Sequence, residues 1–328
     1  MIMNALLLGD PSPALRWRTA VELDGADEDD AEVAAWRAER DHGEEIGDLI
    51  TGLEAAGADV RKAGYLLCRL AYLGYRGPAL ADGADMIFAR QRGDGSWSDA
   101  PPGDDGPRFV TMQTVLPLRG LAAAGYATDP RAERAYAWLL GVRLPDGSWP
   151  AGPKGDLGKG NRAVTPEMEY RRLTRGLGCR SATTGAVACL ALHPERRRSD
   201  EARIGVDHLL ARETRDDATL GWEVARLVGL ERALGQVTFY ATFDLAFLLD
   251  LASRCGVSAA DRRVRALVGH LESLRGPYGL WQHPTHPQLS GWLTFDLESS
   301  LRRLGDGDWV GNEEPATFTP YRRGARRH

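Results

Sequence analysis

The sequence has few cysteines, no long apolar run and no surplus of basic residues. Its four cysteines, Cys68, Cys179, Cys189 and Cys255, lie far apart among apolar residues, which is typical of buried thiols in a reducing compartment and argues against a disulfide framework. No stretch approaches the ~18 consecutive apolar residues of a membrane-spanning helix, and residues 1–8 lack the basic segment of a signal peptide. The net charge of -5 provides no basic face for nucleic acid. These absences predict a soluble, cytoplasmic protein that does not bind nucleic acid.

A seven-residue segment recurs along the chain in degenerate copies. Gln91–Trp97 reads QRGDGSW and Arg143–Trp149 reads RLPDGSW, whereas RGPYGLW at Arg275–Trp281 keeps only the glycine and the tryptophan. A remnant of a fourth copy stands at Gly221 and Trp222. Recurrence at matching places predicts a repeat architecture. We expect the Asp-Gly pair to form a tight turn and the tryptophan to pack back between neighbouring helices.

Two kinds of helix alternate between these turns. Helices that are apolar on almost every face are predicted at 63–73, 111–124, 183–192, 242–252 and 294–304, and helices with one apolar stripe at 129–141, 200–212 and 259–274. A helix apolar all round is buried, whereas a striped helix faces water. The alternation therefore predicts one all-α domain in which an outer ring of helices surrounds an inner ring. We expect a helical lead-in at 1–60, repeats at 61–305 and a tail at 306–328.

These turns between paired helices resemble the repeats of squalene-hopene cyclases and of protein prenyltransferase β subunits, over roughly residues 62–304. The resemblance implies an α/α toroid, a ring of inner helices around a hydrophobic cavity. It also implies a terpene-cyclase-like enzyme, an isomerase or cyclase acting on an isoprenoid or a similar apolar molecule. The turn motifs themselves are expected to be structural and to carry no chemistry.

The acid motif of that superfamily is missing from this chain. Class II terpene cyclases have Asp-x-Asp-Asp at the start of an inner helix, and the resemblance places Ser181–Thr184 at that position. A literal acidic run, Asp27–Asp30, lies in the lead-in, where helix capping explains it. Two parallel Thr-Phe-Asp triplets place Asp244 and Asp296 at the starts of apolar helices. Burial there would raise a carboxyl pKa, so these two are the candidate catalytic acids, unless each only caps its own helix.

Long segments lead from each tryptophan into the next apolar helix, at 98–110, 150–180, 223–240 and 282–291. All are predicted at the end of the ring where the inner helices have their N-termini, and variable loops on a rigid scaffold usually carry function. We expect the cavity to open there, with the basic 150–180 segment holding a diphosphate or another anionic head. The candidate substrate-binding residues are Phe109, Gln113, Arg180, Thr183, Tyr240, Phe243, Trp292 and Phe295.

Other interpretations remain open at this stage. Prenyltransferase β subunits bind zinc, and Cys179, His283 and His286 lie in suitable loops. The ligand patterns of those enzymes are absent, however, so the sequence predicts no metal and no cofactor. A non-catalytic toroid that binds a hydrophobic ligand or a protein is one alternative function. A carbohydrate-active α/α-barrel enzyme is another, and it would need two facing carboxylates ~5 to 9.5 Å apart.

Overall fold

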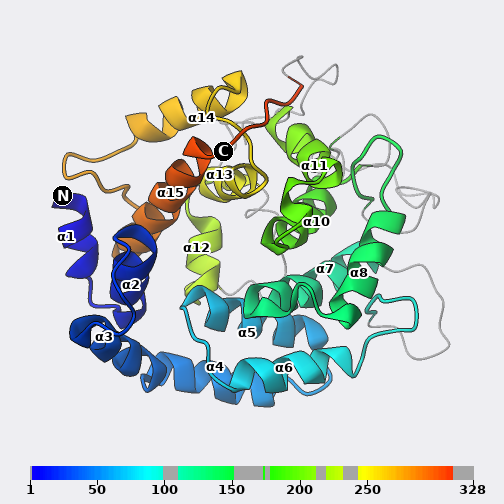
Figure 1. Ribbon diagram of the computed structural model, residues 1–328, viewed down its shortest axis with the longest axis horizontal. Coiled ribbons are helices and arrows are strands. Elements are labelled where there is room, and N and C mark those ends of the chain that lie inside the picture. Colours follow the sequence, from blue (N-terminus) through cyan, green and yellow to red (C-terminus); the bar gives the residue numbers. More distant parts are fainter. Residues whose placement is uncertain are drawn as a thin grey trace, which may run out of the picture.

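The computed structural model describes residues 2–98, 110–150, 173, 178–211, 219–231 and 243–312. In this part of the chain the secondary structure is helical, and extended backbone pairs only as isolated bridges. The helices form an α/α toroid in which one ring surrounds another (Figure 1). The predicted all-α toroid is confirmed.

The inner ring consists of helices that bury most of their surface. They are α5 (Val60–Tyr72), α7 (Val110–Leu121) with its π-helical extension η2 (Ala122–Tyr126), α10 (Arg180–Leu192), α13 (Leu245–Arg254) and α15 (Ser290–Gly305). Each packs on the next in this order. Glycines bring α5 and α7 into backbone contact, because a Cβ on Gly120 would lie 2.2 Å from the carbonyl oxygen of Gly64. The five predicted apolar helices are thus the inner ring.

The outer ring consists of amphipathic helices that each pack on an inner one. They are α6 (Ala79–Phe88), α8 (Pro130–Gly141), α11 (Asp200–Ala211), preceded by the short η3 (Arg196–Arg198), and α14 (Arg262–Ser273). Aspartates begin two of them: Asp129 accepts a hydrogen bond from Arg131 N at 2.7 Å and Asp261 from Arg263 N at 2.9 Å. These carboxylates satisfy amides that have no partner inside the helix. The predicted striped helices are confirmed as outer helices.

The N-terminal helices lie between α15 and α5 and complete the ring (Figure 1). They are α1 (Ile2–Leu8), α2 (Pro13–Arg18) with the π-helical η1 (Thr19–Leu23), α3 (Ala31–Asp41) and α4 (Glu44–Glu54). Ser12 caps α2 by accepting from Leu15 N at 3.3 Å. Because α2 contacts α15 while α4 contacts α5, residues far apart in sequence face each other across the same interior.

Three tryptophan turns share one set of hydrogen bonds. Each indole N–H donates to the carbonyl oxygen ten residues earlier: Trp97 to Ile87 at 2.9 Å, Trp149 to Leu139 at 2.8 Å and Trp281 to Leu271 at 2.7 Å. All three rings are fully buried. The glycine two residues earlier has φ of +92°, +85° and +81° in the three copies, a left-handed conformation that favours glycine. The tryptophans pack between helices as predicted.

A threonine of the following inner helix completes each turn. The hydroxyl oxygen accepts from the tryptophan backbone N–H: Thr114 at 3.1 Å, Thr183 at 3.0 Å and Thr294 at 2.9 Å. These threonines are buried. Each of these hydrogen bonds joins a turn to the inner helix that follows it. The sequence repeat therefore corresponds to a repeated set of hydrogen bonds.

The cysteines and the helix lengths bear on two further expectations. All four cysteines are free and buried, as predicted. Among the residues that the structure describes, no helix has the length and apolar character needed to cross a membrane.

Candidate functional site

A cavity of about 160 Å³ lies inside the inner ring and has two unlike walls. One wall is made of small and apolar side chains from α5, η2 and α10: Ala71, Ala123, Ala188, Ala191 and Leu192. The second wall is defined by its charged side chains from α2, α13 and α15, which are Arg18, Asp250, Arg254 and Asp296, although α13 also contributes Ala246, Phe247 and Leu251 to the lining. Arg119, Glu223 and Asp244 also line the cavity. The resemblance implies a hydrophobic cavity, whereas this one is amphipathic.

The cavity opens toward the C-terminal ends of the inner helices. The lining residues that keep partial exposure, such as Tyr72, Leu192 and Arg254, lie at those ends. At the N-terminal ends the lining residues Glu223 and Asp244 are buried. The loop lengths predict a mouth at the N-terminal ends, and because most of those loops lie outside the described residues, a mouth there stays a prediction.

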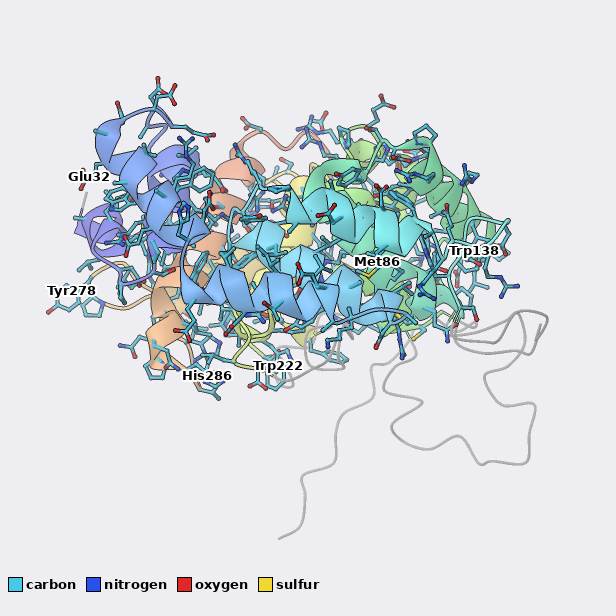
Figure 2. The ribbon with its side chains drawn as sticks, turned by 90° about the horizontal axis from the view of Figure 1, so that it is seen from below. Glu32, Met86, Trp138, Trp222, Tyr278 and His286 are labelled. Carbon is cyan, nitrogen blue, oxygen red and sulfur yellow. The ribbon has the colours of Figure 1, made fainter. Side chains whose placement is uncertain are left out.

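A short helix, α12 (Trp222–Leu227), accounts for the burial at the N-terminal ends. It lies inside the ring (Figure 1), and its residues from Glu223 to Leu227 are buried. Figure 2 shows Trp222 and His286 at the same edge of the molecule, opposite Glu32. Among the described residues, α12 therefore fills the interior near the end of the ring at which the sequence predicts an opening.

Asp296 is the carboxyl group best placed for acid chemistry. It lies within α15, and the Tyr72 hydroxyl donates to its Oδ2 at 3.0 Å. Burial raises the pKa of Asp296 to about 7, although the Arg18 guanidinium opposes the rise. The charge of Asp250 raises this pKa further. A carboxyl group with such a pKa is protonated in a large fraction of molecules near neutral pH.

Asp250 is a second carboxyl group on the same wall, and its pKa is shifted in the opposite direction from that of Asp296. Both of its oxygens accept from Arg254 Nε at 2.9 Å, and Oδ1 also accepts from Arg303 Nη2 at 2.6 Å. Burial alone would raise the pKa of Asp250, but the Arg254 and Arg303 guanidinium groups hold it below its usual value. Two carboxyl groups whose pKa values are pushed apart are the usual arrangement of an acid and its ionised partner.

Asp244 also lines the cavity, but its oxygens already have partners. It is the N-cap of α13, and it accepts from Ala246 N at 3.0 Å, Gly221 N at 3.0 Å and Glu223 N at 2.8 Å. Burial raises the pKa of Asp244 to about 6, while the three backbone hydrogen bonds oppose the rise. Although Asp244 and Asp296 are parallel in sequence, one starts its helix and the other lies inside it. Asp244 is placed to hold the N-terminus of α12.

A buried ionic group fixes α12 against the ring. Glu223 pairs with Arg119 Nη1 at 2.7 Å and with Arg226 Nη2 at 2.6 Å. The far end of the helix is held as well, because Tyr65 donates to the Arg226 carbonyl oxygen at 2.6 Å and Arg69 to that of Leu227 at 2.9 Å. Leaving a buried charge unpaired is costly, so these contacts favour one position of α12.

Of the predicted substrate-binding residues, none that the structure describes is on the lining of this cavity. Those in the described part of the chain are Gln113, Arg180, Thr183, Phe243, Trp292 and Phe295. Phe109 and Tyr240 lie outside the described residues, as does most of the basic 150–180 segment. Gln113 is buried near the start of α7, and Thr183 belongs to the Trp149 turn.

Two of the predicted aromatic residues, Phe243 and Phe295, have an arginine guanidinium over the ring. The Arg180 guanidinium lies 4.5 Å from the ring centroid of Phe243, and that of Arg18 lies 4.4 Å from that of Phe295. Trp292 packs against Tyr72 with ring centroids 5.0 Å apart. Cation–π contacts of this kind already use the negative face of a ring. The aromatic residues that do line the cavity are Tyr72 and Phe247.

The histidines considered for zinc take part in backbone hydrogen bonds. His283 Nε2 contacts the Gly221 carbonyl oxygen at 2.9 Å, and its Nδ1 accepts from His286 N at 3.0 Å. Burial lowers the pKa of His283. Cys179 is buried at the start of α10. Across the described ranges, no group of three or more His, Cys, Asp or Glu side chains is arranged to hold a metal ion.

Several site residues were not predicted from the sequence. They are Arg18, Tyr72, Arg119, Glu223, Asp250 and Arg254. A signal for Arg119 exists, because it is the single charged residue of the apolar helix α7, and such a charge must face a polar interior or a partner. Arg18 has no such signal, since its position depends on how the N-terminal helices close the ring.

Comparison with known proteins yields similarities of fold. No protein-family model and no curated protein matches the chain. A protein from Actinoplanes is 18% identical, with a TM-score of 0.42 over 92% of this chain and 88% of that one. UGL with dGlcA-Glc-Rha-Glc is 17% identical, with a TM-score of 0.47 over 92% of this chain and 88% of that one. The type II terpene cyclase MstE from Scytonema, in complex with geranylgeranyl dihydroxybenzoate, is 16% identical, with a TM-score of 0.31 over 80% and 97%. At such identities the similarity assigns no activity.

Proposed function

We propose that the protein is an enzyme that transfers a proton from Asp296 to a small unsaturated molecule in the central cavity. Isomerisation or cyclisation of an isoprenoid unit is the reaction that this chemistry fits best. The observation that carries the proposal is a cavity-lining carboxyl group whose pKa is raised to about 7 and which is hydrogen-bonded to Tyr72. General acids work best when their pKa lies near the working pH.

The reaction needs no outside reagent. The Oδ–H bond of Asp296 breaks, the π electrons of the alkene form a new C–H bond, and a carbocation remains. Tyr72 and Arg18 stabilise the Asp296 carboxylate that is left behind, and the ionised Asp250 stabilises the cation. Loss of a proton from a neighbouring carbon to the Asp296 carboxylate restores the acid and gives the isomer, or a cyclic alkene if a ring has closed first.

The cavity volume limits the part of the substrate that enters. A cavity of ~150 Å³ in another protein binds benzene, and this one has about 160 Å³. A five-carbon isoprenoid unit therefore fits inside, with the alanine wall against its methyl groups. A longer chain would extend through the mouth.

The test is turnover of linear isoprenoids of five to twenty carbons, with and without a diphosphate, by wild type and Asp296→Asn. We expect the rate to fall by about 10² to 10⁴ in the variant, the usual contribution of a general acid. The wild-type rate should also decline as pH rises through about 7, because the acid then loses its proton. Asp261→Asn is the control, since Asp261 is also a buried carboxyl group but caps an outer helix and does not line the cavity. Equal turnover by wild type and Asp296→Asn would refute the acid role. Binding without turnover by wild type would leave the non-catalytic toroid.

A stability measurement tests the acid without any substrate. The pKa of Asp296 is raised on folding, so its contribution to stability is fully present below about pH 4 and is lost as pH rises through about 7. The melting temperature of wild type should fall over this interval more steeply than that of Asp296→Asn. Parallel curves would mean that the group titrates normally.

A glycoside-cleaving enzyme is the second candidate, because Asp250 and Asp296 form an ionised and a protonated carboxyl group in one cavity. This is the chemical pair that glycosidases use. Aryl glycosides separate the two candidates. Release of the phenol by wild type, lost in both Asp250→Asn and Asp296→Asn, would favour this reaction over alkene protonation.

A further inference from the structure

We propose that the substrate carries an oxyanion, a carboxylate or a phosphate, and that Arg254 binds it at the mouth of the cavity. The inference rests on the proposed function and names the charged group that the substrate brings to it. It places that group at the C-terminal end of the inner ring, and not at the 150–180 segment.

Arg254 lines the cavity and keeps donors that it does not use within the described residues. It is the last residue of α13, it lines the cavity, and its side chain keeps 32% exposure. Its Nε donates to both Asp250 oxygens. In the described residues its Nη1 and Nη2 groups make no hydrogen bond. A guanidinium group with a free edge matches the two oxygens of a carboxylate or phosphate.

The charges around the mouth leave a positive surplus. Arg18 is paired with Glu22, through hydrogen bonds of 2.7 and 2.8 Å. Arg254 and Arg303 share one carboxylate, that of Asp250. When Asp296 is protonated, three arginines therefore face two carboxylates. Burial lowers the pKa of Arg303, the charge of Asp250 opposes this shift, and the charge of Arg254 adds to it.

An oxyanion bound by Arg254 would neutralise the excess positive charge at the mouth and would favour the protonated form of Asp296. A negative charge near Asp296 favours the protonated form of the carboxyl group, which is the form that gives up the proton. Anchored by its head at the mouth, the apolar part of the substrate would lie between the alanine wall and Asp296. Arg119 is a poorer anchor, because it is buried and already paired with Glu223 at 2.7 Å.

The test uses three probes with one five-carbon skeleton and different heads: 3,3-dimethylacrylate, dimethylallyl phosphate and dimethylallyl alcohol. Their dissociation constants are measured by calorimetry with wild type, Arg254→Met and Arg254→Lys. We expect at least one anionic probe to bind wild type about tenfold or more tightly than the alcohol, the effect of a charge-assisted hydrogen bond. Arg254→Met should abolish this preference for an anionic probe over the alcohol, and Arg254→Lys should retain part of it. Arg265→Met, on the exposed side of α14, is the control for a general loss of positive charge.

The outcomes separate the anion site from the proposed reaction. A preference for only one anionic probe identifies the head as carboxylate or phosphate and supports the site. An anion preference that depends on Arg254 supports it even if no variant turns over any isoprenoid, in which case the proposed function alone fails. Equal binding of all three probes by wild type, no binding of any probe, or a preference that survives in Arg254→Met would each overturn the anion site.

Discussion

The turns at Trp97, Trp149 and Trp281, called the intact turns, share a left-handed glycine with the fourth turn at Gly221, but the tryptophan of the fourth turn is less buried. Gly221 has φ of +76°, close to the glycines of the other turns. In the intact turns the next tryptophan is fully buried and a threonine hydroxyl binds its backbone. In the fourth, Trp222 is partly exposed and starts α12, and the carboxylate of Asp244 accepts from the amides on either side of it.

The difference shows where the repeat gives way to a site. In an intact turn the buried tryptophan and threonine that join two layers of helices are neutral, and the turn aspartates Asp94 and Asp146 are exposed. The fourth turn brings Glu223, Arg226 and Asp244 into the interior, where burial of charge is costly. Charges of this kind are retained where they specify one arrangement, and here they hold α12 in the interior of the ring.

The largest effect should come from removing a tryptophan of an intact turn. Trp97→Ala deletes a fully buried ring and its hydrogen bond to Ile87, so we expect the free energy of unfolding to fall by ~3 to 5 kcal/mol. Trp222→Ala, in the fourth turn, should cost less because that ring is only partly buried. Urea denaturation of both variants measures the difference. Equal losses would show that the fourth turn is as structural as the other three.

An intermediate effect should come from Asp244. In Asp244→Ala the amides of Gly221, Glu223 and Ala246 lose their acceptor, and an unsatisfied buried donor costs about 1 to 3 kcal/mol. Asp129→Ala, at the N-cap of outer helix α8, is the matched control and should cost about 1 kcal/mol. Hydrogen exchange at Gly221 and Glu223 should accelerate in the first variant only. Unchanged exchange there would mean that Asp244 does not hold α12.

The ring and its turns could be predicted because they depend on local patterns. Apolar periodicity separates inner from outer helices, and the Asp-Gly-Ser-Trp segments mark the turns before any tertiary contact is known. Asp244 and Asp296 could also be chosen from the sequence as acids at the starts of apolar segments. Both line the cavity, and their catalytic role stays a prediction.

The mouth and the charged wall could not be predicted in the same way. Helix α12 occupies part of a segment that reads as a loop, and its burial depends on Asp244, Arg69 and Tyr65 from distant helices. Arg18 reaches the cavity only because the N-terminal helices close the ring. The positions of α12 and of Arg18 are set by tertiary packing, which produces no periodic pattern in a single sequence.

The smallest effect should come from Thr183, and it distinguishes a turn residue from a substrate-binding one. Thr183 is predicted from the sequence to contact substrate, yet its hydroxyl oxygen accepts from Trp149 N at 3.0 Å and it does not line the cavity. Thr183→Val keeps the shape and removes this bond, so the free energy of unfolding should fall by about 0.5 to 1.5 kcal/mol. Binding of dimethylallyl alcohol and of the two anionic probes should stay as in wild type, because neither the cavity walls nor Arg254 changes. Thr294→Val, the equivalent change at the Trp281 turn, should reproduce the stability loss. If Thr183→Val instead weakened probe binding at unchanged stability, the intact turns would belong to the site, and the division between turn and cavity would fail.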